Sequence, residues 1–227
     1  MTGFHFAFDL NYFGWIRQDF YRDPVWTVQR TCILSLFLFC AGVAQAIAFS
    51  AGQSWPQFWR RWSEVAICAA LVSLGSWWMF PQSWIYFGVL HGIAAMLILT
   101  RLSARCGNVL GFFGAIVLTV WCVAPWLHSA WGGMSIFNLA YLSWVGLAKF
   151  KPVTEDYVPL FPWIAVMWWG FVLGIWWNNR TREKVKRPDA PVGPLQVVLG
   201  WLGRHSLLWY MLHQPVMLGV LTVIFKT

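Results

Sequence analysis

Charged residues are scarce in this chain. Only 11% of its 227 residues are Asp, Glu, Lys or Arg, whereas a soluble globular domain carries about 25%. Acidic side chains are the scarcest, with eight against sixteen basic ones and a formal net charge of +8. The basic residues lie in short segments between apolar runs, as expected for the cytoplasmic loops of a membrane protein. The composition therefore argues against an ordinary soluble domain, and we expect no nucleic-acid partner.

Recognisable motifs for metals, phosphates and nucleophiles are also missing. The chain has no C-x-x-C pair, phosphate-binding glycine loop, nucleophile elbow or H-E-x-x-H. We therefore expect no metal site and no disulfide framework. The cysteines lie mostly in apolar runs and are predicted to be small buried hydrophobic residues. They are Cys32, Cys40, Cys68, Cys106 and Cys122.

What the chain has in abundance is apolar and aromatic surface. Hydrophobic residues make up 59% of it, and it contains 19 tryptophans, a residue favoured at bilayer interfaces. Six apolar runs approach the roughly 20 residues that a spanning helix needs. We predict an all-α fold, a polytopic transmembrane bundle that forms one domain over residues 1–227 in a lipid bilayer. The six runs are Val28–Phe49, Trp62–Phe80, Trp84–Leu102, Val109–Leu127, Leu160–Trp177 and Ser206–Phe225.

The alternation of basic loops predicts one orientation for the bundle. Arg60, Arg105 and the basic connector 178–194 are placed in the cytoplasm by the positive-inside bias, and the 128–159 loop is placed outside. In that loop the apolar run Met134–Ala148 is too short to span and is predicted to be interfacial. Met1–Leu10 is about half a span, so we expect a truncated first helix whose other half lies upstream.

Two histidines lie inside predicted spans. His91 is seven residues past Trp84 and His213 is nine past Arg204, which at 1.5 Å per residue is about 10 and about 13 Å from opposite boundaries. Both would fall near the middle of the bilayer, where an ionisable group marks a functional-site candidate. The alternative is that each ring bonds a carbonyl within the bundle.

Each of these histidines has a neighbour suited to ligand binding. Gly92 follows His91 and allows a close approach by a backbone or an acyl chain, although small-residue helix packing explains it equally well. Gln214 follows His213 and precedes Pro215, which frees a carbonyl and kinks a helix. We predict that these residues bind substrate or line a pore.

His5 and Asp9 form the best acid–base pair in the chain. They are four residues apart and share one face of a helix. A carboxylate beside an imidazole fixes its tautomer and raises its basicity, as a general base requires. An interfacial salt bridge explains the same spacing.

Other charged residues are weaker candidates. Asp156 lies in a proline-rich lead-in to a predicted span, where it could bind a sugar amine or hydroxyl or simply be solvated. Arg204, His205, Arg180 and Arg182 could hold phosphates, although the positive-inside bias also explains the arginines.

Five ordered motifs carry a family resemblance. They are Phe4–Phe13 (FHFAFDLNYF), Leu36–Gly42 (LFLFCAG), Tyr86–Ile93 (YFGVLHGI), Asp156–Trp163 (DYVPLFPW) and Leu202–Pro215 (LGRHSLLWYMLHQP). Together they resemble the bacterial branch of the heparan-alpha-glucosaminide N-acetyltransferase catalytic-domain family, a group of transmembrane acyltransferases. The resemblance covers nearly the whole chain.

The resemblance implies an inner-membrane enzyme that takes an acyl group, in the first instance acetyl, from cytoplasmic acyl-CoA. The acyl group would pass through the bundle to an acceptor such as an amino sugar or glycan on the outer side. The loop Asn11–Pro24 has no histidine where the animal enzyme uses one, so the motif points to His5, oriented by Asp9, as base or transient acyl carrier. The basic residues would hold coenzyme A phosphates. The competing hypothesis is a proton-coupled transporter that uses the midplane histidines. A homodimer is compatible with either function.

Overall fold

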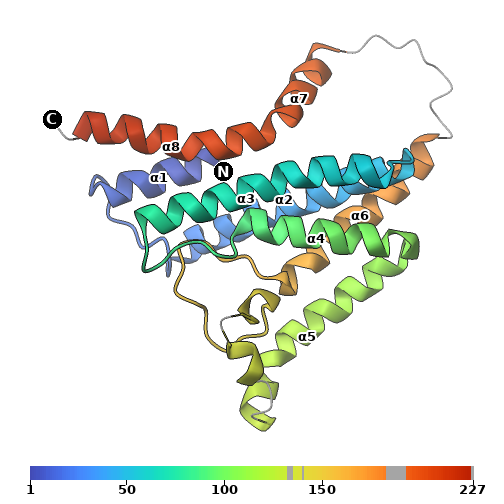
Figure 1. Cartoon of the computed structure of the whole chain (residues 1–227), viewed down its shortest axis with the longest axis horizontal. Coiled ribbons are helices and arrows are strands. Elements are labelled where there is room, and N and C mark those ends of the chain that lie inside the picture. Colours follow the sequence, from blue (N-terminus) through green and yellow to red (C-terminus); the bar gives the residue numbers. More distant parts are fainter. Residues whose placement is uncertain (132–134, 140, 183–192, 226–227) are drawn as a thin grey trace. The chain divides into compact units, whose positions relative to one another are not determined.

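The computed structural model describes residues 1–131, 135–139, 141–182 and 193–225. Within these residues the regular structure is helical, apart from a single bridge between two loops (Figure 1). The α-helices are α1 (Thr2–Tyr12), α2 (Pro24–Ser50), α3 (Trp55–Met79), α4 (Val89–Ser103), α5 (Val109–Trp131), α6 (Leu160–Arg182), α7 (Pro194–Arg204) and α8 (Ser206–Phe225). Three 3₁₀ turns complete the set: η1 (Ala104–Cys106), η2 (Ser135–Asn138) and η3 (Ser143–Val145).

Five of these segments are long and apolar enough to cross a membrane. They are Pro24–Ser50, Val89–Cys106, Val109–His128, Leu160–Thr181 and Ser206–Phe225. This supports a multi-pass membrane protein, but the predicted count of six spans is not confirmed. The sixth candidate is α3, which is long enough but carries Arg60, Arg61 and Glu64 near its start. These charges lower its mean hydropathy.

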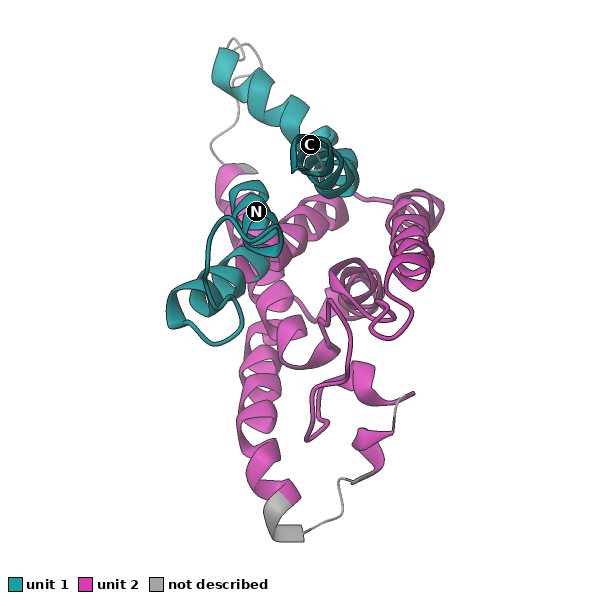
Figure 2. Cartoon of the chain, turned by 90° about the vertical axis from the view of Figure 1, so that its left-hand side faces the viewer, with its two compact units in different colours: residues 1–34, 186–227 teal, residues 35–185 magenta. Residues whose placement is uncertain are grey.

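The described chain divides into two compact units (Figure 2). Unit 1 comprises residues 1–34 and 186–227, and unit 2 comprises residues 35–185. Unit 1 holds α1, the first turns of α2, and α7 and α8. Unit 2 holds the rest of α2 together with α3 to α6. The basic connector predicted over 178–194 lies largely outside the described residues, which omit 183–192.

Small residues let α2 and α6 pack backbone to backbone in unit 2. A Cβ atom added to Gly42 would overlap the carbonyl oxygen of Met167, and one added to Gly170 would overlap that of Phe39. Close approach at glycine is a common way for membrane helices to associate. Phe171 is fully buried beside this crossing, in a cluster with Ala46. Glycines on both helices therefore set the close distance between α2 and α6 at this crossing.

Helix α4 begins later than the sequence indicated. The prediction of a continuous helix from Trp84 is wrong, because the helix starts at Val89 after the extended Gly88. The preceding segment instead pairs with the loop before α6, through a bridge between Phe87 and Tyr157 and a bond from the Val158 N–H to the Phe87 carbonyl. The helical rise used to estimate the depth of His91 therefore does not apply to Trp84–Gly88, and His91 lies in the first turn of α4.

The loop between α5 and α6 is tied to the start of α4. Tyr157 donates a 2.6 Å hydrogen bond to the carbonyl of Ser143, and the Ser143 hydroxyl lies 2.7 Å from the Tyr86 hydroxyl. Thr154 donates to the carbonyl of Trp84 at 2.9 Å. The apolar run that was predicted to be interfacial forms short 3₁₀ turns in its described part. These bonds hold the described part of the loop in place without a long helix.

Helices α1 and α8 lie side by side in unit 1 (Figure 1). They run in the same direction, because contacts advance together along both: Trp209 Nε1 donates to Thr2 Oγ1 at 3.0 Å, and the rings of Phe13 and Phe225 lie 5.5 Å apart further on. Helix α7 was not predicted. It begins at Pro194, where the Gln196 side chain accepts a hydrogen bond from the Gly193 N–H.

Many large apolar side chains face outward, including Trp78 and Val223 at 86% and 74% exposed. Such exposure is typical of surfaces that contact lipid rather than water. The prediction of buried cysteines is wrong, because most of these side chains lie on outward-facing positions. Cys32, Cys40, Cys106 and Cys122 are exposed, and Cys68 is half-buried.

Candidate functional site

The α1–α8 pair brings together four residues that the sequence singled out. Gln214 Nε2 on α8 donates a 2.8 Å hydrogen bond to Asp9 Oδ1 on α1. One turn earlier on α1, the ring of His5 lies 5.1 Å from that of His213 between centroids, at an interplanar angle of 60°. We call His5, Asp9, His213 and Gln214 the α1–α8 cluster. His5 and Asp9 share a helix face, as their spacing predicted.

The tautomer of His213 follows from its contacts. Its Nδ1 atom lies 2.7 Å from the Tyr210 carbonyl and 3.1 Å from the Trp209 carbonyl. A carbonyl only accepts, so Nδ1 carries the proton. In the neutral ring Nε2 is then an acceptor, and it is buried with no hydrogen-bond partner in the described part of the chain. His213 therefore holds an unused proton acceptor inside the α1–α8 cluster.

Asp9 adds a second unused acceptor. The residue is 1% exposed, and its Oδ2 atom has no hydrogen-bond partner among the described residues. The Gln214 Oε1 atom is buried and unpartnered in the same sense. A buried acceptor without a donor is costly. The cluster is therefore suited to a ligand that brings donors, such as a hydroxyl or an amine.

The hydrogen bonds of Asp9 differ from those of the expected acid–base pair with His5. The Oδ1 atom of Asp9 accepts its hydrogen bond from Gln214, and Oδ2 has no partner within the described residues. No hydrogen bond therefore joins Asp9 to His5. The physical reason is that the amide of Gln214 approaches Asp9 from the neighbouring helix. Pro215 lies inside α8, directly after this contact.

The segment after α1 folds back over the N-terminal side of the cluster. Phe20 is 3% exposed and stacks against Trp26 with a centroid separation of 4.2 Å. Phe4 contacts both rings edge-on and also the ring of His5 at 5.8 Å. Aromatic walls of this kind exclude water and strengthen the electrostatic interactions inside.

A second polar group lies in unit 2 around His91. Ser73 Oγ on α3 lies 3.0 Å from His91 Nε2 and donates to the carbonyl of Ile85 at 2.7 Å. Because the hydroxyl proton is used on Ile85, His91 Nε2 is the donor to Ser73 and Nδ1 is left as an acceptor. Nδ1 is buried without a partner among the described residues. Sequence reasoning missed Ser73, since no local spacing links it to His91.

Gly92 and Asp156 also belong to unit 2. A Cβ added at Gly92 would lie 2.7 Å from the carbonyl oxygen of Val158, so the space at Gly92 is filled by the chain's own backbone. Asp156 Oδ2 accepts a 2.7 Å hydrogen bond from the Val89 N–H. It thus caps the start of α4, where a carboxylate also complements the helix dipole.

The basic residues expected to hold phosphates lie on α6 and at the end of α7. Arg204 and His205 are exposed at the end of α7, and the His205 ring packs 4.6 Å from that of Trp201. The Arg180 guanidinium lies 4.5 Å from the ring centre of Trp176 on α6. The side chain of Arg182 lies outside the described residues.

Arg101 is a polar residue that the sequence reasoning left unassigned. It is 9% exposed and donates from Nη2 to the carbonyl of Gln53. Its guanidinium lies 5.2 to 5.9 Å from the ring centres of Phe49, Trp55 and Phe58, which is within cation–π range. A buried arginine could have been suspected only from the apolar residues around it in the sequence.

Comparison with known proteins decides the family. The model of the family described as heparan-alpha-glucosaminide N-acetyltransferase, catalytic, matches residues 1–215. The chain belongs to this family. No curated protein and no solved structure gives a significant match. The resemblance stated from the five motifs is thereby confirmed, and the match includes both halves of the α1–α8 cluster.

Proposed function

We propose that this protein is an integral-membrane acyltransferase, with acetyl-CoA on the cytoplasmic side of the inner membrane as donor. The acceptor would be an amino sugar or glycan on the outer side. Membership of an N-acetyltransferase family supports the reaction class. The observation that carries the proposal is the α1–α8 cluster, in which two imidazoles and a buried carboxylate meet and leave acceptor atoms unpaired.

In the proposed reaction the acceptor nitrogen or oxygen attacks the thioester carbonyl carbon. A C–N or C–O bond forms, the C–S bond breaks, and the thiolate that leaves takes up a proton. His5 would receive the proton of the acceptor and pass it to the leaving thiolate. If His5 instead carries the acyl group, its nitrogen first displaces the thiolate, and the acceptor then attacks the acyl-imidazole and breaks the bond between the acyl carbon and His5. Asp9 would stabilise the imidazolium through its negative charge, and Gln214 would hold Asp9 in place. His213 Nε2 would accept a hydrogen bond from the acceptor.

Other residues would serve the two substrates. Arg204, His205, Arg180 and Arg182 would contact the coenzyme A phosphates, for which guanidinium groups are well suited. Within unit 2, His91 would line the route of a substrate and offer its unpartnered Nδ1 as an acceptor. Gly92 and Asp156 would support His91, since both hold the start of α4 against the 154–158 segment.

The test is acetyl transfer in proteoliposomes, with radiolabelled acetyl-CoA outside and glucosamine inside, or the reverse orientation. His5→Ala is expected to lower the rate about 10²–10⁴-fold, the usual contribution of a general base. His128→Gln is the matched control, because the Leu147 carbonyl is the one hydrogen-bond partner of His128 Nε2 among the described residues. Glutamine retains a donor there, so we expect the control to keep wild-type activity.

Transfer by His5→Ala at the wild-type rate would refute the assigned role. Absence of transfer by the wild-type protein, combined with pH-dependent uptake of a solute, would favour the transporter. Binding of coenzyme A provides an independent check, because a rise in the unfolding temperature with coenzyme A is expected only for the enzyme.

A further inference from the structure

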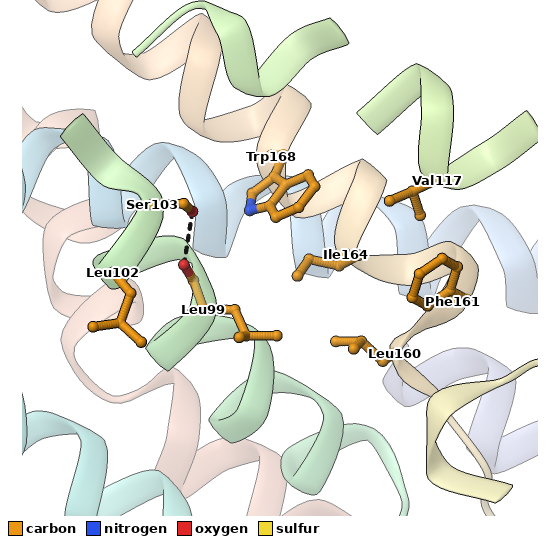
Figure 3. A pocket seen from close by; sticks show the side chains of 8 residues that line it. All are labelled: Leu99, Leu102, Ser103, Val117, Leu160, Phe161, Ile164 and Trp168. Atoms are coloured by element: carbon orange, nitrogen blue, oxygen red, sulfur yellow. Dashed lines mark hydrogen bonds between the residues drawn. The ribbon is translucent and has the colours of Figure 1, made fainter. Parts of the chain in front are cut away.

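Helices α4, α5 and α6 enclose an apolar groove in unit 2, with a volume of about 420 Å³ (Figure 3). Its lining is Leu99, Leu102, Ser103, Val117, Leu160, Phe161, Ile164 and Trp168. All three helices are among those apolar and long enough to cross a membrane. Leu102 is 63% exposed at its rim. The groove therefore opens on a surface that contacts hydrocarbon.

The two polar side chains of the lining lie toward one end. Figure 3 shows Ser103 facing the side of the Trp168 ring that carries the nitrogen, whereas Leu160, Phe161 and Val117 lie at the other end. The Ser103 hydroxyl is satisfied by the Leu99 carbonyl at 2.7 Å. The Trp168 Nε1–H is buried and has no hydrogen-bond partner among the described residues. The groove is thus amphipathic along its length, with one unused donor.

A basic residue follows the polar part of the lining closely in the sequence. Arg105 lies two residues after Ser103, in η1, and is exposed. No ion pair or hydrogen bond of its side chain occurs within the described ranges. Basic residues beside clefts between spanning helices, on the cytoplasmic side, attract anionic lipid headgroups. The positive-inside bias places Arg105 on that side.

We propose that this groove is a binding site for one anionic phospholipid. An acyl chain would fill the apolar end, and the ester carbonyl would accept a hydrogen bond from Trp168 Nε1. The phosphate would lie near Arg105. Within a bilayer no water is available to satisfy the indole N–H, so a lipid carbonyl is the natural acceptor. The inference stands apart from the acyltransferase proposal, since it uses none of its residues.

The experiment is a lipid titration of the delipidated full chain in detergent, read by native mass spectrometry and thermal unfolding. Phosphatidylglycerol is compared with phosphatidylcholine of the same chains and with glycerol phosphate, which has the anionic group alone. We expect one phosphatidylglycerol to bind more tightly than phosphatidylcholine, and glycerol phosphate to cause no stabilisation.

Two variants test the contacts. Arg105→Gln should weaken phosphatidylglycerol binding about fivefold, the effect of one basic residue near a membrane surface. Trp168→Phe, which keeps the ring but removes the N–H, should weaken both lipids about two- to tenfold, as expected for one hydrogen bond. Arg60→Gln and Trp78→Phe are matched controls, because both residues are exposed outside the groove.

Equal binding of the two lipids, or losses in the two variants no larger than those in their controls, would overturn the proposal. Stabilisation by glycerol phosphate equal to that by phosphatidylglycerol would also overturn it, because the site would then bind a free anion. Protection by acyl-CoA at this groove, with no effect of phospholipid, would assign the groove to the donor instead.

Discussion

Gln214 donates a 2.8 Å hydrogen bond to Asp9 across 205 positions of the sequence. Asp9 is 1% exposed, so this amide is the donor that makes a buried carboxyl tolerable between α1 and α8. A buried acceptor that loses its donor bears its full desolvation cost. The pair therefore stabilises the packing of the two helices and fixes one wall of the α1–α8 cluster.

Gln214→Leu is expected to lower the free energy of unfolding by about 1–2 kcal/mol, because Asp9 is left unpaired. Thermal unfolding in detergent measures the change, with exposed Gln82→Leu as the control. The double variant Asp9→Leu/Gln214→Leu should recover much of the loss, since both polar groups are then removed together. Simple addition of the two single losses would show that the pair does not interact.

Much of the helical fold could be predicted from apolar runs alone. The start and end of α8 coincide with the predicted Ser206–Phe225, and α5 and α6 begin at the predicted Val109 and Leu160. Trp84 to Gly88 was misassigned because this stretch is equally apolar, and hydropathy does not separate a helix from an extended segment. The extended conformation of Trp84 to Gly88 depends on pairing with the 154–158 segment, some 70 residues later.

The candidate site was predictable only where its residues are close in sequence. His5 and Asp9 were found together because they are four residues apart. Their contact with α8 depends on the packing of two helices from opposite ends of the chain, which no local pattern encodes. Ser73 was missed for the same reason. Its partner His91 comes from another helix, and a serine in an apolar run carries no signal of its own.

The α2–α6 crossing predicts a strong effect of a single methyl group. Gly42→Ala should lower the free energy of unfolding by about 1–3 kcal/mol, because its Cβ would overlap the backbone carbonyl of Met167. Gly75→Ala is the control, since nothing lies within 4 Å of its added Cβ and alanine favours the helix. Chemical unfolding of both variants measures the difference. Equal stability of the two would show that α2 and α6 can separate without cost.

The free energy of unfolding is expected to depend on pH through Tyr157, which lies outside the membrane-spanning segments. Burial, with a contribution from Tyr86, raises the pKa of Tyr157 to about 12, above its usual value of about 10. The unfolded phenol ionises first, so the stabilisation is complete below about pH 10 and is lost as the pH rises to about 12. At pH 8 the protonated hydroxyl donates to Ser143.

Tyr157→Phe should therefore be less stable than the wild type at pH 8 by about 1 kcal/mol, the net value of one hydrogen bond. The difference should shrink between pH 10 and pH 12. Thermal unfolding over this range measures it, with exposed Tyr141→Phe as a control that shows no such trend. A difference that stays constant to pH 12 would contradict the assignment.

Variants of Asp156 can distinguish a structural role of its carboxylate from a role in substrate binding. Its Oδ2 accepts from the Val89 N–H at the start of α4. Asp156→Ala should lower the free energy of unfolding by about 0.5–2 kcal/mol, the usual effect of losing a helix cap. Acetyl transfer should fall with it, because His91 lies in the same first turn.

Asp156→Asn is the decisive variant, because asparagine caps helices about as well as aspartate while removing the charge. If Asp156 acts only as the cap of α4, the variant should keep the unfolding temperature and the KM for glucosamine of the wild type. A rise in KM for the amino sugar at an unchanged unfolding temperature would instead show that the carboxylate contacts the acceptor amine. The same measurement with an uncharged sugar acceptor separates the two explanations, since only an amine would lose an ion pair.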